Sequence, residues 1–238
     1  MMIRNPKQID SNVFDCIPQV GPCSIGCNQC FYNRPDAFYV PIDKPHVPSV
    51  EEVGNGIVRM NCGNDSNHQR ELVIETAQRY KHYFFNTSIP RFDFPGPVVL
   101  TANPSEEESH LYIHPTAPNN LMFVRLRVSA TNLPLIDKAV EGWTALQVPV
   151  VLTFMAYYDK CPQVDEEVVG LPEEECYEWK VRYVNSYHCP TPTFIRQVTQ
   201  RYVGNRLVTT CGGYCRDCHN CETYYWQTLK RLQETGEE

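Results

Sequence analysis

Three cysteines near the N-terminal end stand close enough in sequence to bind one metal centre together. They belong to the segment Cys23-Ser-Ile-Gly-Cys27-Asn-Gln-Cys30, which Phe31 and Tyr32 follow directly. Three thiolates can hold three irons of a cubane [4Fe–4S] cluster, whereas a cluster used for electron transfer normally takes four cysteines. The fourth iron would then have no protein ligand and would be open to a cosubstrate, which is a catalytic arrangement.

A zinc site and a disulfide are the other interpretations of this cysteine triplet (Cys23, Cys27 and Cys30). Zinc would need a fourth ligand, for example Cys16 or a histidine, and zinc sites usually consist of separated C-x2-C pairs. A disulfide is disfavoured because the three thiols fall within eight residues and because disulfides are rare in reducing compartments. The spacing therefore favours the iron–sulfur interpretation.

A second set of cysteines, which we call the C-terminal cysteine group, consists of Cys211, Cys215, Cys218 and Cys221. So dense a run can hold an auxiliary iron–sulfur cluster, or a tetrahedral zinc that ties the last strand to the last helix. Thiolates suit either metal, so both assignments stay open. The sequence assigns no role to four further cysteines: Cys62, Cys161, Cys176 and Cys189.

The cysteine triplet resembles the signature of the radical S-adenosylmethionine (SAM) enzymes. Its position agrees as well, because it follows the first predicted strand, residues 13–17, where that family carries its cysteines. One departure is that many members have an aromatic residue just before the third cysteine, where this chain has Gln29. In the family, the open iron binds the amino and carboxylate groups of SAM.

The segment after the second predicted strand supports the same resemblance. Radical SAM enzymes carry a Gly-Gly-Glu-like segment there, which holds the amino group of SAM. This chain has a looser match in its candidate SAM-binding residues, which are Gly63, Asn64, Asp65 and Ser66. Either Asp65 or Asn64 can accept a hydrogen bond from an ammonium group. The segment can equally form a turn in which Ser66 or Asn67 caps the following helix.

The predicted strand at residues 122–129 gives a third support. Phe123, Arg125, Arg127 and Ser129 share one face of this strand by its period of two, and the other face is apolar. Inside a partial barrel, Arg125 or Arg127 could meet the carboxylate of SAM or an anionic substrate. Ser129 would stand where the family often contacts the ribose. An edge strand with a solvated face is the alternative.

Six short β-like segments predict an α/β fold, namely a partial (β/α)6 barrel of mostly parallel strands. The strands are expected at 13–17, 57–61, 98–101, 122–129, 150–157 and 206–210. Helices are expected over about 69–85, 133–147 (with Asn132 as its cap), 193–202 and 222–233. Residues 159–190 break this rhythm and predict an inserted strand or hairpin. We expect a core over 1–210, followed by a cysteine-rich metal segment and a terminal helix over 211–238.

Composition limits the classes of partner. The chain has 238 residues, 42% of them hydrophobic, and a net charge of −7, which is typical of a globular protein and argues against a broad nucleic-acid or membrane surface. It has no apolar run of the 18 or so residues that a membrane span needs, and its N-terminus lacks the apolar region of a secretory signal. Twelve cysteines without such a signal indicate metal or redox chemistry in the cytoplasm.

The resemblance implies a reaction. An electron from the reduced cluster would cleave SAM to methionine and a 5′-deoxyadenosyl radical, which would take hydrogen from a small-molecule or peptide substrate. An electron donor such as a flavodoxin or ferredoxin is implied. We expect the substrate between the SAM site and the C-terminal cysteine group. A non-catalytic iron–sulfur or zinc protein is the competing class, and a radical SAM enzyme that modifies nucleic acid is a second alternative.

Overall fold

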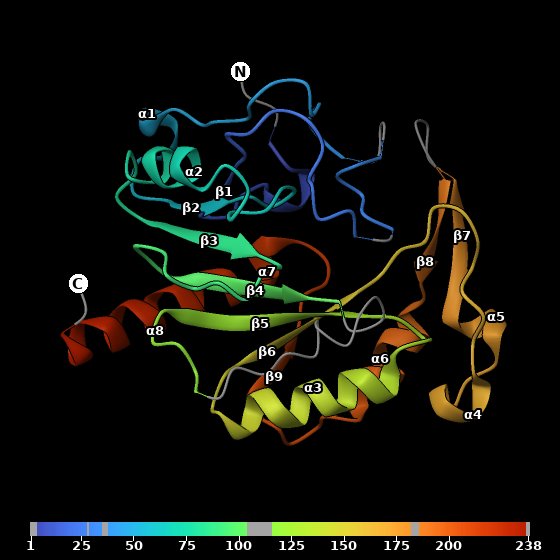
Figure 1. Cartoon of the computed structure of the whole chain (residues 1–238). Helices are drawn as coiled ribbons and strands as arrows, with labels where there is room; N and C mark the ends of the chain where they lie inside the picture. The colour runs from blue at the N-terminus through green and yellow to red at the C-terminus, as the bar shows by residue number, and fades with distance from the viewer. Residues whose placement is uncertain (1–3, 28, 35–37, 104–115, 182–185, 237–238) are drawn as a thin grey trace.

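The core of the molecule is one parallel sheet (Figure 1). The computed structural model describes residues 4–27, 29–34, 38–103, 116–181 and 186–236. In these ranges seven strands pair in the order β1-β2-β3-β4-β5-β6-β9, and every pair is parallel. Their bounds are β1 (Val13–Cys16), β2 (Ile57–Met60), β3 (Tyr83–Thr87), β4 (Val98–Ala102), β5 (Leu121–Val128), β6 (Val150–Phe154) and β9 (Val208–Thr210). The sheet curls into a partial barrel, as the α/β pattern predicts.

Strand β3 is the main difference from the sequence expectation. The helix expected over 69–85 ends early, as α2 (Arg70–Ala77), and the chain then enters β3. Tyr80 and Phe84 have helical spacing, but Phe84 and Phe85 are both fully buried, in apolar clusters on opposite faces of the sheet. Burial of consecutive residues on both faces is typical of a strand inside a parallel sheet. The expectation of six strands was therefore one too few.

Four helices cover the outer, convex face of the sheet. Beside α2 these are α1 (Val50–Val53), α3 (Leu133–Ala145) and α6 (Pro192–Gln200). Ser49 caps α1 by accepting a hydrogen bond from the Glu52 N–H at 3.1 Å. The side chain of Asn132 does not cap α3. It accepts instead from the N–H of Ser129 at 2.8 Å, because the chain turns tightly there after β5.

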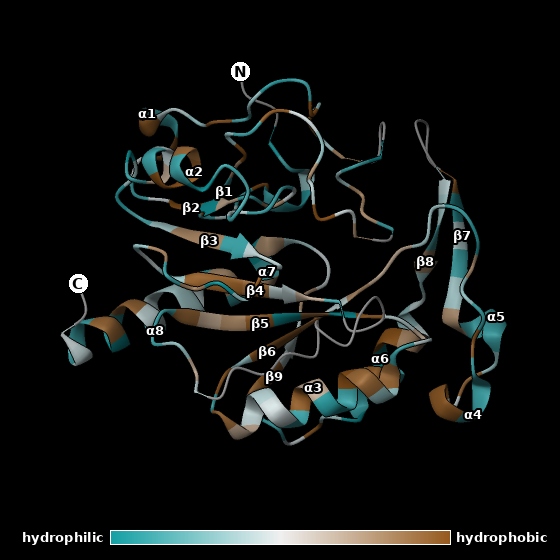
Figure 2. Ribbon diagram, in the orientation of Figure 1, coloured by the Kyte–Doolittle hydropathy of each residue, from teal (hydrophilic) through white to brown (hydrophobic). Residues whose placement is uncertain are grey.

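Helix α8 (Asn220–Thr235) covers part of the inner, concave face. One apolar residue from each of six strands packs with Tyr225 of this helix, namely Val13, Ile57, Phe84, Val99, Phe123 and Val151. Gly236 has a φ of +71° and ends α8. In Figure 2, β3 and β5 change from brown to teal toward their C-terminal ends, so the apolar layer gives way to a polar one.

A separate hairpin follows β6. The segment contains α4 (Glu166–Val169), α5 (Glu173–Cys176) and the antiparallel pair β7 (Tyr177–Val181) and β8 (Ser186–Pro190). A strand or hairpin is the sequence expectation for residues 159–190, and this antiparallel pair lies in that range. The remaining short elements are η1 (Pro6–Gln8) and α7 (Cys215–Cys218). Over the described ranges, every helix is too short or too polar to cross a membrane.

Candidate functional site

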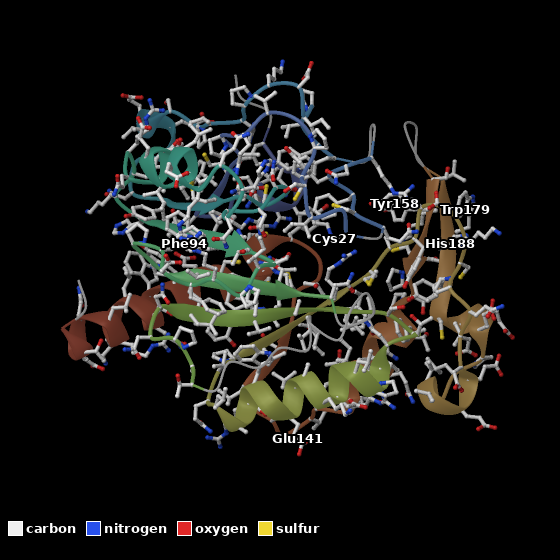
Figure 3. All side chains as sticks on the ribbon, viewed as in Figure 1. Cys27, Phe94, Glu141, Tyr158, Trp179 and His188 are labelled. Atoms are coloured by element: carbon white, nitrogen blue, oxygen red, sulfur yellow. The ribbon has the colours of Figure 1, made fainter. Side chains whose placement is uncertain are left out.

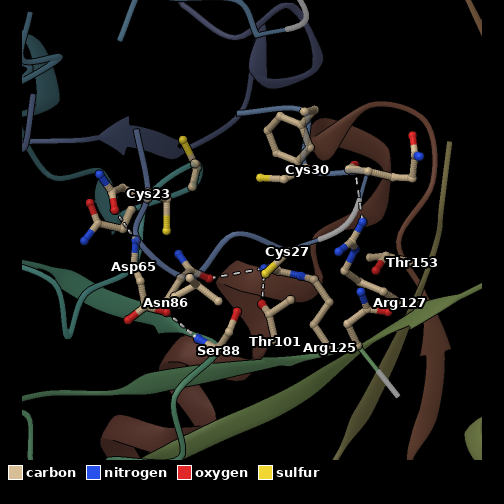
Figure 4. Close-up of a pocket in the computed structure, with 18 of the residues that line it drawn as sticks. Cys23, Cys27, Cys30, Asp65, Asn86, Ser88, Thr101, Arg125, Arg127 and Thr153 are labelled. Carbon is tan, nitrogen blue, oxygen red and sulfur yellow. Dashed lines mark hydrogen bonds between the residues drawn. The ribbon is translucent and has the colours of Figure 1, made fainter. Parts of the chain in front are cut away.

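A polar layer follows the apolar layer along the concave face. Arg59, Asn86, Thr101, Arg125 and Thr153 each stand two residues after an apolar member of the previous layer. Because side chains alternate along a strand, these five share its concave face. They line one pocket of about 420 Å³ at the C-terminal ends of the strands (Figure 4). Small-molecule sites typically have about 300–1,000 Å³, and parallel α/β folds bind ligands at this edge.

All three members of the cysteine triplet line this pocket (Figure 4). Their loop follows β1, and its start is fixed by Asn33. The Asn33 side chain accepts from the Cys23 N–H at 2.8 Å and donates to the Cys23 carbonyl at 3.1 Å. The structure thus brings the triplet to the edge where the sequence analysis expects it.

The triplet loop is held from the far side of the pocket by the segment after β6. Gln29 accepts from the Tyr158 N–H at 2.9 Å, and Arg34 makes a two-pronged ion pair with Asp159 at 2.7 Å. The Arg34 guanidinium also lies 5.3 Å from the ring centre of Tyr158. In Figure 3, Tyr158 lies between Cys27 and the hairpin that carries Trp179 and His188. Because these contacts span the pocket, they hold the triplet loop over it.

The thiols of the cysteine triplet are the type of ligand that an iron–sulfur cluster uses. Their positions in the structure, however, are not those of residues bound to a metal. In the described ranges, no three His, Cys, Asp or Glu side chains are arranged to hold a metal ion. Burial raises the pKa of Cys23, so its thiol is protonated at neutral pH. Three soft sulfur donors around one pocket fit a cluster. Binding one requires the thiols to lose their protons and move closer together.

The Asp65 carboxylate accepts hydrogen bonds from neighbouring segments of the protein itself. It accepts from the N–H groups of Asn67 at 2.8 Å and Ser88 at 2.6 Å, and from the Thr87 hydroxyl at 3.0 Å. These bonds tie the loop after β2 to the end of β3. Ser66 is fully buried, accepts from the Asn61 amide at 3.2 Å and does not line the pocket.

Gly63 and Asn64 do line the pocket, beside the triplet loop. The capping role considered for Ser66 and Asn67 is not seen, because α2 starts at Arg70 without a side-chain cap. The loop after β2 is therefore a turn held by Asp65, with Gly63 and Asn64 facing the ligand space.

The two arginines of β5 enter the pocket at different depths. Arg125 donates from Nη1 to Asn86 Oδ1 and Thr101 Oγ1, both at 3.2 Å. Arg127, one side-chain repeat further along, donates to the carbonyl of Gln29 in the triplet loop at 3.5 Å. Both arginines thus lie where the sequence analysis expects them, on the inner face of the sheet.

Ser129 stands outside the pocket. It is fully buried, and its hydroxyl lies 2.6 Å from the Tyr157 hydroxyl and 3.0 Å from that of Thr131. Strand β5 has ended at Val128, so the alternation that aligns Arg125 and Arg127 no longer applies.

The C-terminal cysteine group lies beside the same pocket. Cys211 follows β9 and lines the pocket, and both Cys211 and Cys221 pack against the apolar layer under α8. A hydrogen bond with the Cys218 thiol lowers the pKa of Cys211 against the opposing effect of burial, and the nearby Arg125 guanidinium acts in the same direction. Cys211 is the member of the group that faces the ligand space.

Cys62 is a pocket residue that sequence spacing did not reveal. It follows β2 and lines the pocket, and its Sγ lies 3.6 Å from the Tyr39 hydroxyl. That hydroxyl donates to Asp15 at 2.8 Å, and Asp15 forms an ion pair with Arg59 at 2.7 Å. In the sequence, only the position of Cys62 directly before Gly63 indicates that it lies near the pocket.

Comparison with known proteins gives no relative: no family model, no curated protein and no solved structure matches this chain.

Proposed function

We propose that this chain is a radical SAM enzyme in which Cys23, Cys27 and Cys30 hold a [4Fe–4S] cluster with one open iron. The observation that supports it is the meeting of all three thiols with Gly63 and Asn64 at one pocket, at the C-terminal edge of a curled parallel sheet. When bound and reduced, such a cluster supplies the electron that cleaves SAM to methionine and a 5′-deoxyadenosyl radical.

Different residues around the triplet are assigned to different parts of SAM. Gly63 and Asn64 face the ligand space beside the triplet loop, so we assign the amino end of SAM to them. Asp65 positions this loop through its bonds to Asn67 and Ser88. Arg127, in contact with the triplet loop, is assigned to the carboxylate.

The proposal extends to the rest of the pocket. A small-molecule or peptide substrate would lie between the triplet loop and Cys211, which border the same space. The C-terminal cysteine group would hold an auxiliary cluster or zinc, and a flavodoxin or ferredoxin would supply electrons. Metal analysis of Cys215→Ala/Cys218→Ala distinguishes the two metals, because the variant loses either iron or zinc relative to the wild type.

Anaerobic reconstitution tests the proposed reaction. With iron, sulfide, SAM and a strong reductant, the wild type should form 5′-deoxyadenosine. The variant Cys23→Ala/Cys27→Ala/Cys30→Ala should form none and should lose about four irons per chain. Cys161→Ala/Cys189→Ala is the matched control, since both cysteines lie outside the pocket, and it should behave as the wild type. No 5′-deoxyadenosine from fully loaded wild-type protein would contradict the proposal.

The position of Cys62 favours one other function, an electron-transfer cluster closed by a fourth thiolate. Cys62 lines the same pocket as the triplet. The variant Cys62→Ala separates the two functions. An open cluster predicts full iron content and continued SAM cleavage in this variant, whereas a closed cluster predicts loss of iron and no SAM cleavage even in the wild type.

A further inference from the structure

We propose that Arg125 binds an anionic group of the substrate, a carboxylate or a phosphate, in the deeper part of the pocket. Calling this ligand the substrate rests on the proposed function. The anion site itself does not, and it can be tested without any SAM chemistry.

Arg125 is a half-buried guanidinium that the protein's own hydrogen bonds use only in part. Both of its hydrogen bonds come from Nη1 and go to neutral acceptors, on Asn86 and Thr101. Within the described ranges no carboxylate pairs with it, and Nε and Nη2 donate to no protein acceptor. Arg59 in the same layer has Asp15 at 2.7 Å. Because a charge removed from water needs a compensating partner, the free edge of Arg125 indicates an anionic ligand.

The charge of the whole pocket points the same way. Lys7, Arg59, Arg125 and Arg127 line it, and Asp65 is the one carboxylate among its lining residues in the described ranges. Asp15 neutralises Arg59, and backbone N–H groups hold Asp65. SAM carries a sulfonium and an ammonium against one carboxylate, and its net positive charge offsets the net negative charge of a [4Fe–4S]2+ cluster with three thiolates. The excess of Lys7, Arg125 and Arg127 over Asp65 therefore remains after both are bound. An anionic substrate balances it.

Depth along β5 separates this site from the one assigned to the SAM carboxylate. Residues two apart on a strand differ by roughly 6.6 Å along it. Arg127 contacts the triplet loop through Gln29. Arg125 lies further in, between Asn86 and Thr101, and Cys211 lines the same pocket. Arg127 therefore faces the bound SAM, and Arg125 faces the space between SAM and the C-terminal cysteine group.

Titration calorimetry of the reconstituted protein tests the site, with inorganic phosphate and succinate as probes in low-chloride buffer. The wild type should bind at least one of them, and which one it binds assigns the anion class. Arg125→Gln should bind at least tenfold more weakly, and Arg125→Lys should recover part of the affinity. Arg206→Gln removes the same charge at an exposed arginine outside the pocket, so it should bind as the wild type.

Three results would overturn the proposal. The first is wild-type protein that binds neither probe, or Arg125→Gln that binds them unchanged. The second is an equal loss of SAM affinity in Arg125→Gln, which would assign the guanidinium to the SAM carboxylate. The third is loss of metal from the C-terminal cysteine group with anion binding intact, which would make Arg125 a counter-charge for thiolates. Failure of the proposed reaction has a different signature, because the wild type would then bind anions but form no 5′-deoxyadenosine.

Discussion

Gly63 allows the loop after β2 to lie directly against the buried ring of Tyr32. A Cβ atom on Gly63 would stand 2.3 Å from Tyr32 Cδ2, and Tyr32 is only 1% exposed. We predict that Gly63→Ala lowers the free energy of unfolding by about 1–3 kcal/mol, the usual cost of overpacking, as measured by chemical denaturation. The control is Gly212→Ala, whose Cβ would meet nothing within 4 Å. Equal stability of the two variants would contradict the contact.

Asp15 and Arg59 form a buried ion pair beside the pocket. The Asp15 side chain is 1% exposed and that of Arg59 is 13% exposed. Burial by itself would raise the pKa of Asp15, but the charge and hydrogen bond of Arg59, with bonds from Tyr39 and Asn5, hold this pKa below its usual value. A carboxyl group with a lowered pKa stabilises the fold above its unfolded-state pKa of about 3.9, and this stabilisation is lost as the pH falls through the folded-state pKa.

The variant Asp15→Asn should therefore be destabilised in a pH-dependent way. At neutral pH we expect a loss of about 3–5 kcal/mol, because Arg59 becomes a buried charge without a partner. Denaturation curves between about pH 7 and pH 3 should show the stability difference from the wild type narrowing at the acid end, where Asp15 becomes protonated in the unfolded chain before it does in the folded one. The double variant Asp15→Asn/Arg59→Met should recover part of the stability. If the stability difference between Asp15→Asn and the wild type stayed constant over this pH range, the ion pair with Arg59 would not be its cause.

At the scale of elements, the sequence predicted most strands but only part of the pocket. Alternation over β5 is long enough to place Arg125 and Arg127 on the inner face in advance. Strand β2 is only four residues long, so its alternation is too short to show that Arg59 shares that face. The Asp65 carboxylate faces Ser88, which follows β3, a strand that helix-like spacing concealed. Contacts between loops of different strands carry no local sequence signal, and the pocket consists mainly of such contacts.

The bridge between the triplet loop and the segment after β6 gives an element-scale prediction. Arg34 and Asp159 are both partly exposed, so Arg34→Ala should change global stability little. It should, however, release the triplet loop, and amide hydrogen exchange over residues 23–34 should become faster. Arg91→Ala removes a comparable exposed pair with Asp93 in another loop and should leave that exchange unchanged. Identical exchange in both variants would show that the bridge does not hold the loop.

At the scale of the whole molecule, the concave face of the sheet is divided between a structural half and a ligand-binding half. Helix α8 packs on the apolar layer, and the pocket occupies the polar layer that follows. The sequence predicts a terminal helix over about 222–233, but not which face of the sheet it covers. That placement brings Cys211 of the C-terminal cysteine group to the same pocket as the triplet, although the two lie near opposite ends of the chain.

Because the thiols of the triplet surround the pocket without metal-binding geometry, loading the cluster must draw parts of the chain together. A group that binds only the folded state stabilises it by mass action. We therefore predict that anaerobic reconstitution raises the melting temperature and slows amide exchange over residues 23–34 and around Gly63. The variant Cys23→Ala/Cys27→Ala/Cys30→Ala should lose the slowing of exchange and part of the rise in melting temperature even when the C-terminal cysteine group is loaded. Cys161→Ala/Cys189→Ala should keep both effects in full. If full iron loading left melting and exchange unchanged, the metal would be bound away from this pocket, and the shared site of the triplet and the loop after β2 would be wrong.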